Sequence, residues 1–98
     1  MAAKGYWIAQ VDVTDAEGYK AYQAEIQHPL RRYGGHFLVR GGRSETVEGQ
    51  SRARAVIIAF DSYDQALACY RSPEYARAKA LRQGRATADV IVVEGYEG

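Results

Sequence analysis

Two predicted strands are apolar on both faces, and this feature constrains the fold of the chain more than any other. Side chains alternate along a strand, so each predicted strand presents two separate faces. In residues 54–60, one face carries Val56, Ile58 and Phe60, and the other face carries Ala55, Ile57 and Ala59. The segment 88–94 repeats this pattern, with Val90 and Val92 opposite Ile91 and Val93. A sheet with one face in water has strands that alternate between apolar and polar residues. Both faces of this sheet therefore need apolar cover.

The predicted elements follow the order β-α-β-β-α-β. Strands are expected over residues 5–13, 36–40, 54–60 and 88–94, and helical regions over residues 14–33 and 62–83. This order is that of the split-βαβ, ferredoxin-like α+β sandwich, with helices on one face of a mostly antiparallel sheet. We expect one such domain over residues 1–98. Ser44–Val47 is expected to continue the second strand as a bent extension, and Ser72-Pro73 to restart a helix.

The first helical region has clear start and stop signals. Thr14 and Glu17 have the spacing of a capping box, which predicts Thr14 as the N-cap. Asp15 is an alternative cap. Pro29 lies late in the apolar stripe and should kink the helix or end its regular part. Gly34 is the expected C-terminal stop.

The apolar second face of the sheet predicts a dimer. A lone domain with one helical layer would leave that face exposed as a large apolar patch. Packing the sheet of one copy against the sheet of another, around a two-fold axis, removes this patch. The chain is therefore expected to be a homodimer through its sheet face.

The segment Tyr33–Gly42 carries the best candidates for a site. Two glycine doublets bracket its strand, and alternation predicts that His36, Leu38 and Arg40 share one face. A neutral imidazole can act as a base near neutral pH, so His36 is the catalytic candidate. Arg40 could hold a carboxylate or an enolate. The alternative is that Arg40 pairs with an acidic residue across the dimer and His36 is exposed at the start of the strand.

Tyrosines could supply the walls of a pocket. The chain has eight of them, and Tyr22 and Tyr75 lie on the apolar stripes of the two helical regions. We expect these two to line a pocket between the helices and the sheet, beside Arg40 and His36. The alternative is that the tyrosines are core residues whose hydroxyls reach the rim.

Several classes of function find no support in the sequence. The formal net charge of +1 gives no field for nucleic acid or an anionic membrane surface, and no apolar run is long enough to cross a membrane. The histidines and the single Cys69 do not have the spacing of a metal site, and neither glycine doublet matches a phosphate-binding loop. We expect no metal and no cofactor. A lone cysteine fits a reducing compartment, so we expect a cytoplasmic protein.

Several motifs together resemble one bacterial family. They are Gly5-Tyr6-Trp7-Ile8-Ala9, Asp15-Ala16-Glu17-Gly18-Tyr19, the glycine doublets at 34–35 and 41–42, Phe60-Asp61-Ser62, Arg71-Ser72-Pro73-Glu74-Tyr75 and Val93-Glu94-Gly95. The family is called domain of unknown function 1330 (DUF1330), and the resemblance covers residues 5–96. It implies membership of the dimeric α/β-barrel superfamily, which includes cofactor-independent monooxygenases, muconolactone isomerases and haem-dependent chlorite dismutases. The family itself has no established general activity. Members often carry tryptophan where this chain has Cys69.

Two functions remain open from the sequence. The first is a homodimer that binds a small apolar or aromatic acid between sheet and helices, with or without cofactor-independent catalysis. The second is a non-catalytic dimer with a structural or stress-related role. A tyrosine-lined cavity with Arg40 pointing inward would favour the first, and a filled core with Arg40 in an inter-subunit salt bridge would favour the second.

Overall fold

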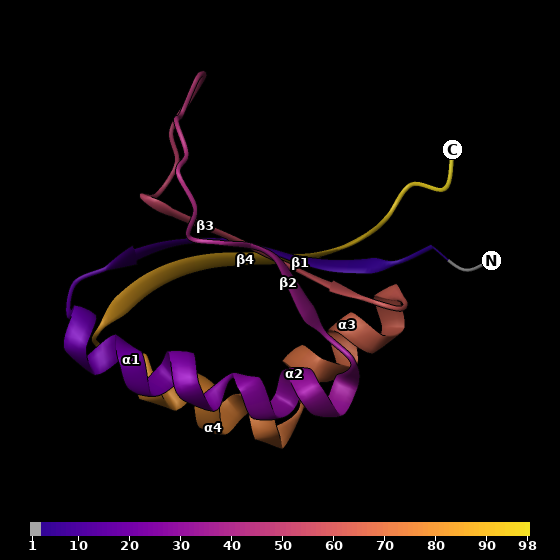
Figure 1. Ribbon diagram of the computed structural model, residues 1–98, viewed down its shortest axis with the longest axis horizontal. Helices are drawn as coiled ribbons and strands as arrows, with labels where there is room; N and C mark the ends of the chain where they lie inside the picture. The colour runs from indigo at the N-terminus through magenta and orange to yellow at the C-terminus, as the bar shows by residue number, and fades with distance from the viewer. Residues whose placement is uncertain (1–2) are drawn as a thin grey trace.

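The four strands form a single antiparallel sheet, shown in Figure 1 for the computed structural model, which describes residues 3–98. The elements are β1 (Gly5–Val13), α1 (Ala16–Glu25), α2 (Gln27–Tyr33), β2 (His36–Arg40), β3 (Arg54–Phe60), α3 (Tyr63–Tyr70), α4 (Pro73–Leu81) and β4 (Ala86–Glu94). The strand order is β2-β3-β1-β4, and every neighbouring pair is antiparallel. The predicted ferredoxin-like α+β fold is confirmed.

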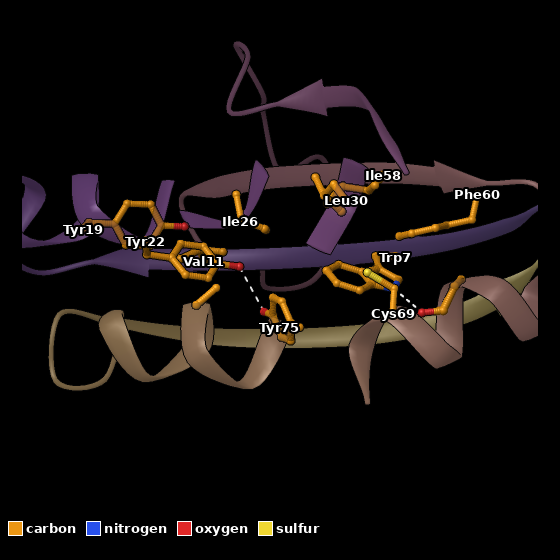
Figure 2. Packing of buried hydrophobic residues seen from close by; sticks show 12 residues of the cluster. Trp7, Val11, Tyr19, Tyr22, Ile26, Leu30, Ile58, Phe60, Cys69 and Tyr75 are labelled. Carbon is orange, nitrogen blue, oxygen red and sulfur yellow. Dashed lines mark hydrogen bonds between the residues drawn. The ribbon is translucent and has the colours of Figure 1, made fainter. Parts of the chain in front are cut away.

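All four helices cover the same face of the sheet (Figure 1). The main core lies between the helices and the sheet. It is centred on Trp7 of β1, whose ring centroid lies 5.3 Å from that of Phe60 and 4.9 Å from that of Tyr75. The indole Nε1 of Trp7 donates a hydrogen bond of 2.8 Å to the carbonyl of Ala66 in α3 (Figure 2). One side chain therefore joins the sheet to both helices of the second helical region.

The first helical region is two helices with a break at Ile26. Asp15 is the N-cap of α1, because its carboxylate accepts from the Gly18 amide at 3.1 Å, so the prediction of Thr14 is wrong and the alternative is confirmed. Pro29 has no N–H to donate to the carbonyl four residues earlier, and α1 ends at that residue, Glu25. Gly34 ends α2 with a φ of 75°, as predicted.

The second helical region is also divided as predicted. Ser62 caps α3 by accepting from the amide of Gln65 at 3.0 Å. Ser72 caps α4 by accepting from the amide of Tyr75 at 3.1 Å, and Pro73 occupies the first turn. The new N-cap at Ser72 fixes the start of α4 and with it the position of Tyr75.

The segment between β2 and β3 contains no strand within residues 41–53, so the predicted extension over Ser44–Val47 is wrong. Gly41 donates to the Ala55 carbonyl and then turns the chain with a φ of 71°. This segment rises from the sheet on the side opposite the helices (Figure 1). The turn at Gly41 removes Ser44–Val47 from the ladder with β3.

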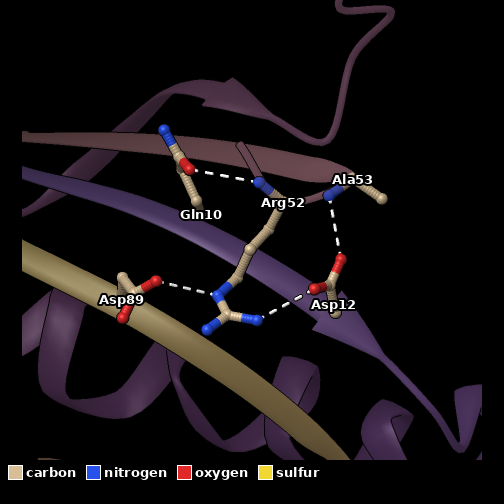
Figure 3. Close-up of polar contacts among 5 residues, drawn as sticks. All are labelled: Gln10, Asp12, Arg52, Ala53 and Asp89. Atoms are coloured by element: carbon tan, nitrogen blue, oxygen red, sulfur yellow. Dashed lines mark hydrogen bonds and ion pairs between the residues drawn. The ribbon is translucent and has the colours of Figure 1, made fainter. Parts of the chain in front are cut away.

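Arg52 fastens the base of this segment to the sheet (Figure 3). Its guanidinium binds Asp12 of β1 at 2.9 Å and Asp89 of β4 at 2.8 Å. The Asp12 carboxylate also accepts from the amide of Ala53 at 3.0 Å. The backbone bond from Ala53 and the charged bond from Arg52 lower the pKa of Asp12.

The face of the sheet away from the helices is apolar and open in the single chain. Four large apolar side chains on this face are exposed, namely Ile8 (36%), Leu38 (56%), Ile91 (59%) and Val93 (37%). They are exposed although Ile8, Ile91 and Val93 lie in paired regions of the sheet. The apolar second face predicted from the sequence is therefore present. Within residues 3–98, every helix is too short or too polar to cross a membrane.

Candidate functional site

A small cavity lies between the sheet and the helices. The strand register places its floor residues in adjacent rows, namely Ala88, Val11 and Arg54, then Val90, Ala9, Val56 and Arg40, then Trp7, Ile58 and Phe37. Ala9 and Ala88 are the smallest of these side chains, and they leave space beneath the helices. The floor is therefore apolar, with arginines along its β2 and β3 side.

Aromatic side chains form the walls of this cavity. Helix α1 contributes Tyr19 and Tyr22, and α4 contributes Tyr75, with Arg82 immediately after α4. The cavity offers about 40 Å³ to the centres of water-sized molecules. A single water needs roughly 10–15 Å³ on this measure, so the space holds more than one water. A larger occupant requires the flexible arginine side chains at its edge to move.

A β-bulge decides which candidate residues reach the cavity. Phe37 pairs with Ile58, but Val39 pairs with Ile57, so Leu38 is an extra residue in β2. The bulge reverses the alternation after Leu38 and places Arg40 on the same face as Phe37.

The prediction that His36, Leu38 and Arg40 share one face is therefore wrong. His36 pairs with Ala59, which faces away from the helices, whereas Arg40 pairs with Val56 in the cavity floor. His36 is exposed and does not line the cavity. Arg40, Tyr22 and Tyr75 do line it.

Arg40 lies at the cavity edge with partners that leave its charge uncompensated. Its guanidinium carbon lies 4.3 Å from the centroid of the Phe37 ring, and Nη2 donates to the Gln23 carbonyl at 3.5 Å. With the Gln27 amide turned so that its oxygen faces Arg40, that oxygen accepts two bonds of 3.2 and 3.3 Å. All of these partners are neutral, so the guanidinium can still bind an anion.

Arg54 is a second arginine of the floor, and sequence reasoning missed it. Its Nε is buried without a hydrogen-bond partner. Its guanidinium lies directly against Gly41, where any side-chain Cβ would collide with it. Burial raises the pKa of the neighbouring Tyr19 hydroxyl, and the positive charges of Arg54 and Arg82 partly offset this effect. Gly41, the first residue of the second glycine doublet, therefore leaves room for a guanidinium beside the cavity.

Arg82 joins two tyrosine hydroxyls on the helical side. The hydroxyls of Tyr22 and Tyr75 lie 3.0 Å apart (Figure 2). Arg82 Nη2 donates to the Tyr75 oxygen at 3.4 Å, and its guanidinium carbon lies 5.4 Å from the centroid of the Tyr22 ring. Burial, followed by the adjacent Tyr75, raises the pKa of Tyr22. Tyr22 therefore remains a neutral phenol that can donate or accept a proton in a hydrogen bond.

The three cavity arginines lack acidic partners. Within residues 3–98, no carboxylate oxygen lies within 4.0 Å of a guanidinium nitrogen of Arg40, Arg54 or Arg82. Arg82 follows α4 and is half-buried against tyrosines. The signal for Arg54 was its position two residues before Val56, which places a charge on an apolar strand face.

Other reactive side chains lie outside this cavity. His28 is exposed beside Glu25. Cys69 is buried, and burial raises the pKa of its thiol to about 12, so the thiol is a weak nucleophile at neutral pH. The described part of the chain, residues 3–98, contains no group of three or more His, Cys, Asp or Glu residues that could hold a metal ion.

Comparison with known proteins places the chain in a family. The model of the family described as "Domain of unknown function (DUF1330)" matches residues 4–96. The chain belongs to this family. No curated protein matches its sequence. The resemblance identified from the glycine doublets and the Ser-Pro-Glu-Tyr segment is confirmed, and it covers nearly the whole of this DUF1330 member.

Solved structures share the fold of this DUF1330 member at low sequence identity. A protein of unknown function from Rhodopseudomonas palustris has a TM-score of 0.75 and 18% identity, covering 100% of this chain and 86% of its own. SnoaB, a cofactor-independent oxygenase from Streptomyces nogalater, has a TM-score of 0.66 and 14% identity, covering 99% and 97%. A dimeric protein of unknown function with a ferredoxin-like fold, from Bacteroides fragilis, has a TM-score of 0.61 and 12% identity, covering 93% and 95%.

Proposed function

We propose that this DUF1330 protein is a cytoplasmic homodimer that binds a small apolar or aromatic acid between its sheet and helices. The observation that carries the proposal is a cavity with aromatic walls and three arginines that have no carboxylate partner among residues 3–98. Arg40 holds the anionic group, and Tyr22 and Tyr75 contact the apolar body. The buried thiol of Cys69 supports the reducing compartment.

The protein acts in this proposal as a cofactor-independent enzyme. The likeness to SnoaB, which is described as a cofactor-independent oxygenase, supports this class of chemistry on this fold. Within the cavity, the Tyr22 and Tyr75 hydroxyls and the guanidinium of Arg82 can stabilise negative charge that develops on a bound acid. His36 has no part in this cavity, because the bulge at Leu38 leaves it on the other face. The comparisons do not favour the non-catalytic alternative.

The homodimer forms through the open face of the sheet in this proposal. Ile8, Leu38, Ile91 and Val93 give that face an exposed apolar surface, which a second copy would remove from water. The neighbour from Bacteroides fragilis, which is described as dimeric with a ferredoxin-like fold, supports a dimer. Light scattering at micromolar concentration should give the mass of two chains for the wild type. Ile91→Glu places a charge in the interface and should give the mass of one chain, whereas a monomeric wild type would disprove the dimer.

A thermal-shift screen with aromatic and hydroxy acids tests the ligand proposal. At least one acid should raise the melting temperature of the wild type, and Arg40→Ala should lose most of that shift. A charged hydrogen bond contributes roughly 1.5–3 kcal/mol, so the affinity should fall by about tenfold or more. Arg77→Ala is the matched control, because Arg77 is exposed on α4 and does not line the cavity. Equal shifts in the wild type and Arg40→Ala would remove the main support for the proposal.

A further inference from the structure

We infer that the cavity is built for a dianion, an acid that carries two negative groups on a small apolar or aromatic body. This inference rests on the proposed function and names the class of ligand for the same site. Its starting observation is that Arg40, Arg54 and Arg82 all line one cavity. A single carboxylate would leave two of these three positive charges uncompensated, and a dianion leaves one.

Arg40 and Arg54 are close neighbours on the cavity floor. Arg40 pairs with Val56, and Arg54 lies two residues before Val56 on the same face of β3. The guanidinium of Arg54 also lies against Gly41, the residue that follows Arg40. Diagonal neighbours of this kind in a sheet have Cα atoms roughly 7–8 Å apart, within reach of long side chains. Like charges at this spacing repel each other, and an anionic group bound between them would remove the repulsion.

Arg82 supplies positive charge from the opposite wall. It follows α4, on the helical side, and it shares the Tyr75 hydroxyl with Tyr22. A second anionic group can therefore accept from Arg82 and a tyrosine hydroxyl while the first is held by Arg40 and Arg54. The apolar residues between the two sides, including Ala9 and Val11, suit a hydrocarbon body that connects the two groups.

Arg52 shows how the same chain compensates an arginine that has a structural role. Its guanidinium contacts two carboxylates, at 2.9 and 2.8 Å from Asp12 and Asp89. Arg54, two residues later, has a buried Nε without any partner. A buried polar group without a partner carries a cost in stability, and a bound ligand is the partner that would offset this cost.

Calorimetric titration at fixed ionic strength tests this inference with two matched pairs of acids. Benzoate is compared with isophthalate, and crotonate with fumarate, because each pair keeps the skeleton and changes the number of carboxylates. In at least one pair the diacid should bind about tenfold tighter than the monoacid, since an added charged hydrogen bond is typically worth that factor. Equal or tighter binding of both monoacids would overturn the dianion inference and leave the proposed function standing. If no acid of either pair binds at millimolar concentration, the proposed function fails as well.

Variants of the cavity separate specific binding from general attraction of anions. Arg54→Gln should reduce the preference for the diacid to less than about threefold, while the monoacid still binds through Arg40. Arg54→Lys keeps the charge and should retain more of the preference, which provides a second reading if Arg54→Gln folds poorly. Arg77→Gln removes an exposed arginine outside the cavity and should leave the preference unchanged. An equal loss in Arg77→Gln and Arg54→Gln would overturn the inference.

Discussion

The two faces of the sheet each carry arginines, but the arginines differ in what surrounds them. On the open face, Arg52 contacts the carboxylates of Asp12 and Asp89 and holds the segment 41–53 to the sheet. On the helix-covered face, Arg54 lines a cavity and has a buried nitrogen without a partner. The two residues are only two positions apart in the chain.

Carboxylate partners, rather than residue type or burial, therefore distinguish a structural arginine from one that is available to a ligand. Asp12 and Asp89 already use the donors that Arg52 presents to the sheet. Arg54 lies next to the Tyr19 hydroxyl and Gly41, and neither of them carries a negative charge. Arginine side chains stay charged at physiological pH, so the presence or absence of neighbouring carboxylates decides their roles.

The largest effect should come from the core beneath the covered face. Trp7→Ala removes an indole that is 3% exposed, together with its hydrogen bond to the Ala66 carbonyl. We expect a loss of about 3–5 kcal/mol in the free energy of unfolding, measured by urea denaturation. Val47→Ala, in the segment 41–53 where Val47 is 88% exposed, is the control and should change the stability little. Similar losses in both variants would show that the covered face is not the main core.

An intermediate effect is expected when each arginine is replaced by methionine, and the change in stability should have opposite signs for Arg54 and Arg52. Arg54→Met removes a charge that has no acidic partner and should raise the stability of the ligand-free protein by about 1 kcal/mol. Arg52→Met leaves Asp12 and Asp89 without their shared cation and should lower the melting temperature. The melting temperatures of both variants are measured by calorimetry, in a buffer whose anions bind arginine side chains weakly. A stability loss in Arg54→Met would contradict the contrast between the two faces.

The smallest effect should be the pH dependence of the Arg52 cluster. The backbone bond from Ala53 and the bond from Arg52 lower the folded-state pKa of Asp12, so its stabilising effect is complete above the unfolded-state value of about 3.9. The effect is lost as the pH falls through the lower folded-state pKa. Asp12→Asn should therefore melt below the wild type at neutral pH, and the two melting temperatures should converge below about pH 4. A difference that persists unchanged at low pH would rule out this linkage.

Much of the fold could be predicted because its signals are local. Apolar strands, Pro73 at a helix start and Gly34 at a helix end each act within a few residues. The N-cap of α1 could not be predicted from the sequence, because Thr and Asp are both good N-cap residues. Only the path of the backbone selects Asp15 over Thr14. The segment Ser44–Val47 reads as a strand, but the turn at Gly41 directs it away from its partner.

The site was only partly visible in the sequence. Tyr22, Tyr75 and Arg40 line the cavity, but His36 does not, because one extra residue at Leu38 reverses the faces of β2. Nothing in the five residues of this strand distinguishes a bulge from plain alternation, since the bulge depends on pairing with β3. Arg82 could not be found either, because its contacts with Tyr22 and Tyr75 join segments far apart in the chain.

The cavity arginines are expected to bind an acid, whereas Arg52 is not. Nuclear magnetic resonance of the arginine Nε–Hε groups during titration with isophthalate observes both kinds of arginine in one experiment. Saturable shifts are expected for Arg40, Arg54 and Arg82, and an unmoved signal is expected for Arg52, whose Nε already donates to Asp89 at 2.8 Å. Shifts confined to Arg52 and to arginines outside the cavity, or no saturable shift in any cavity arginine, would contradict this expectation.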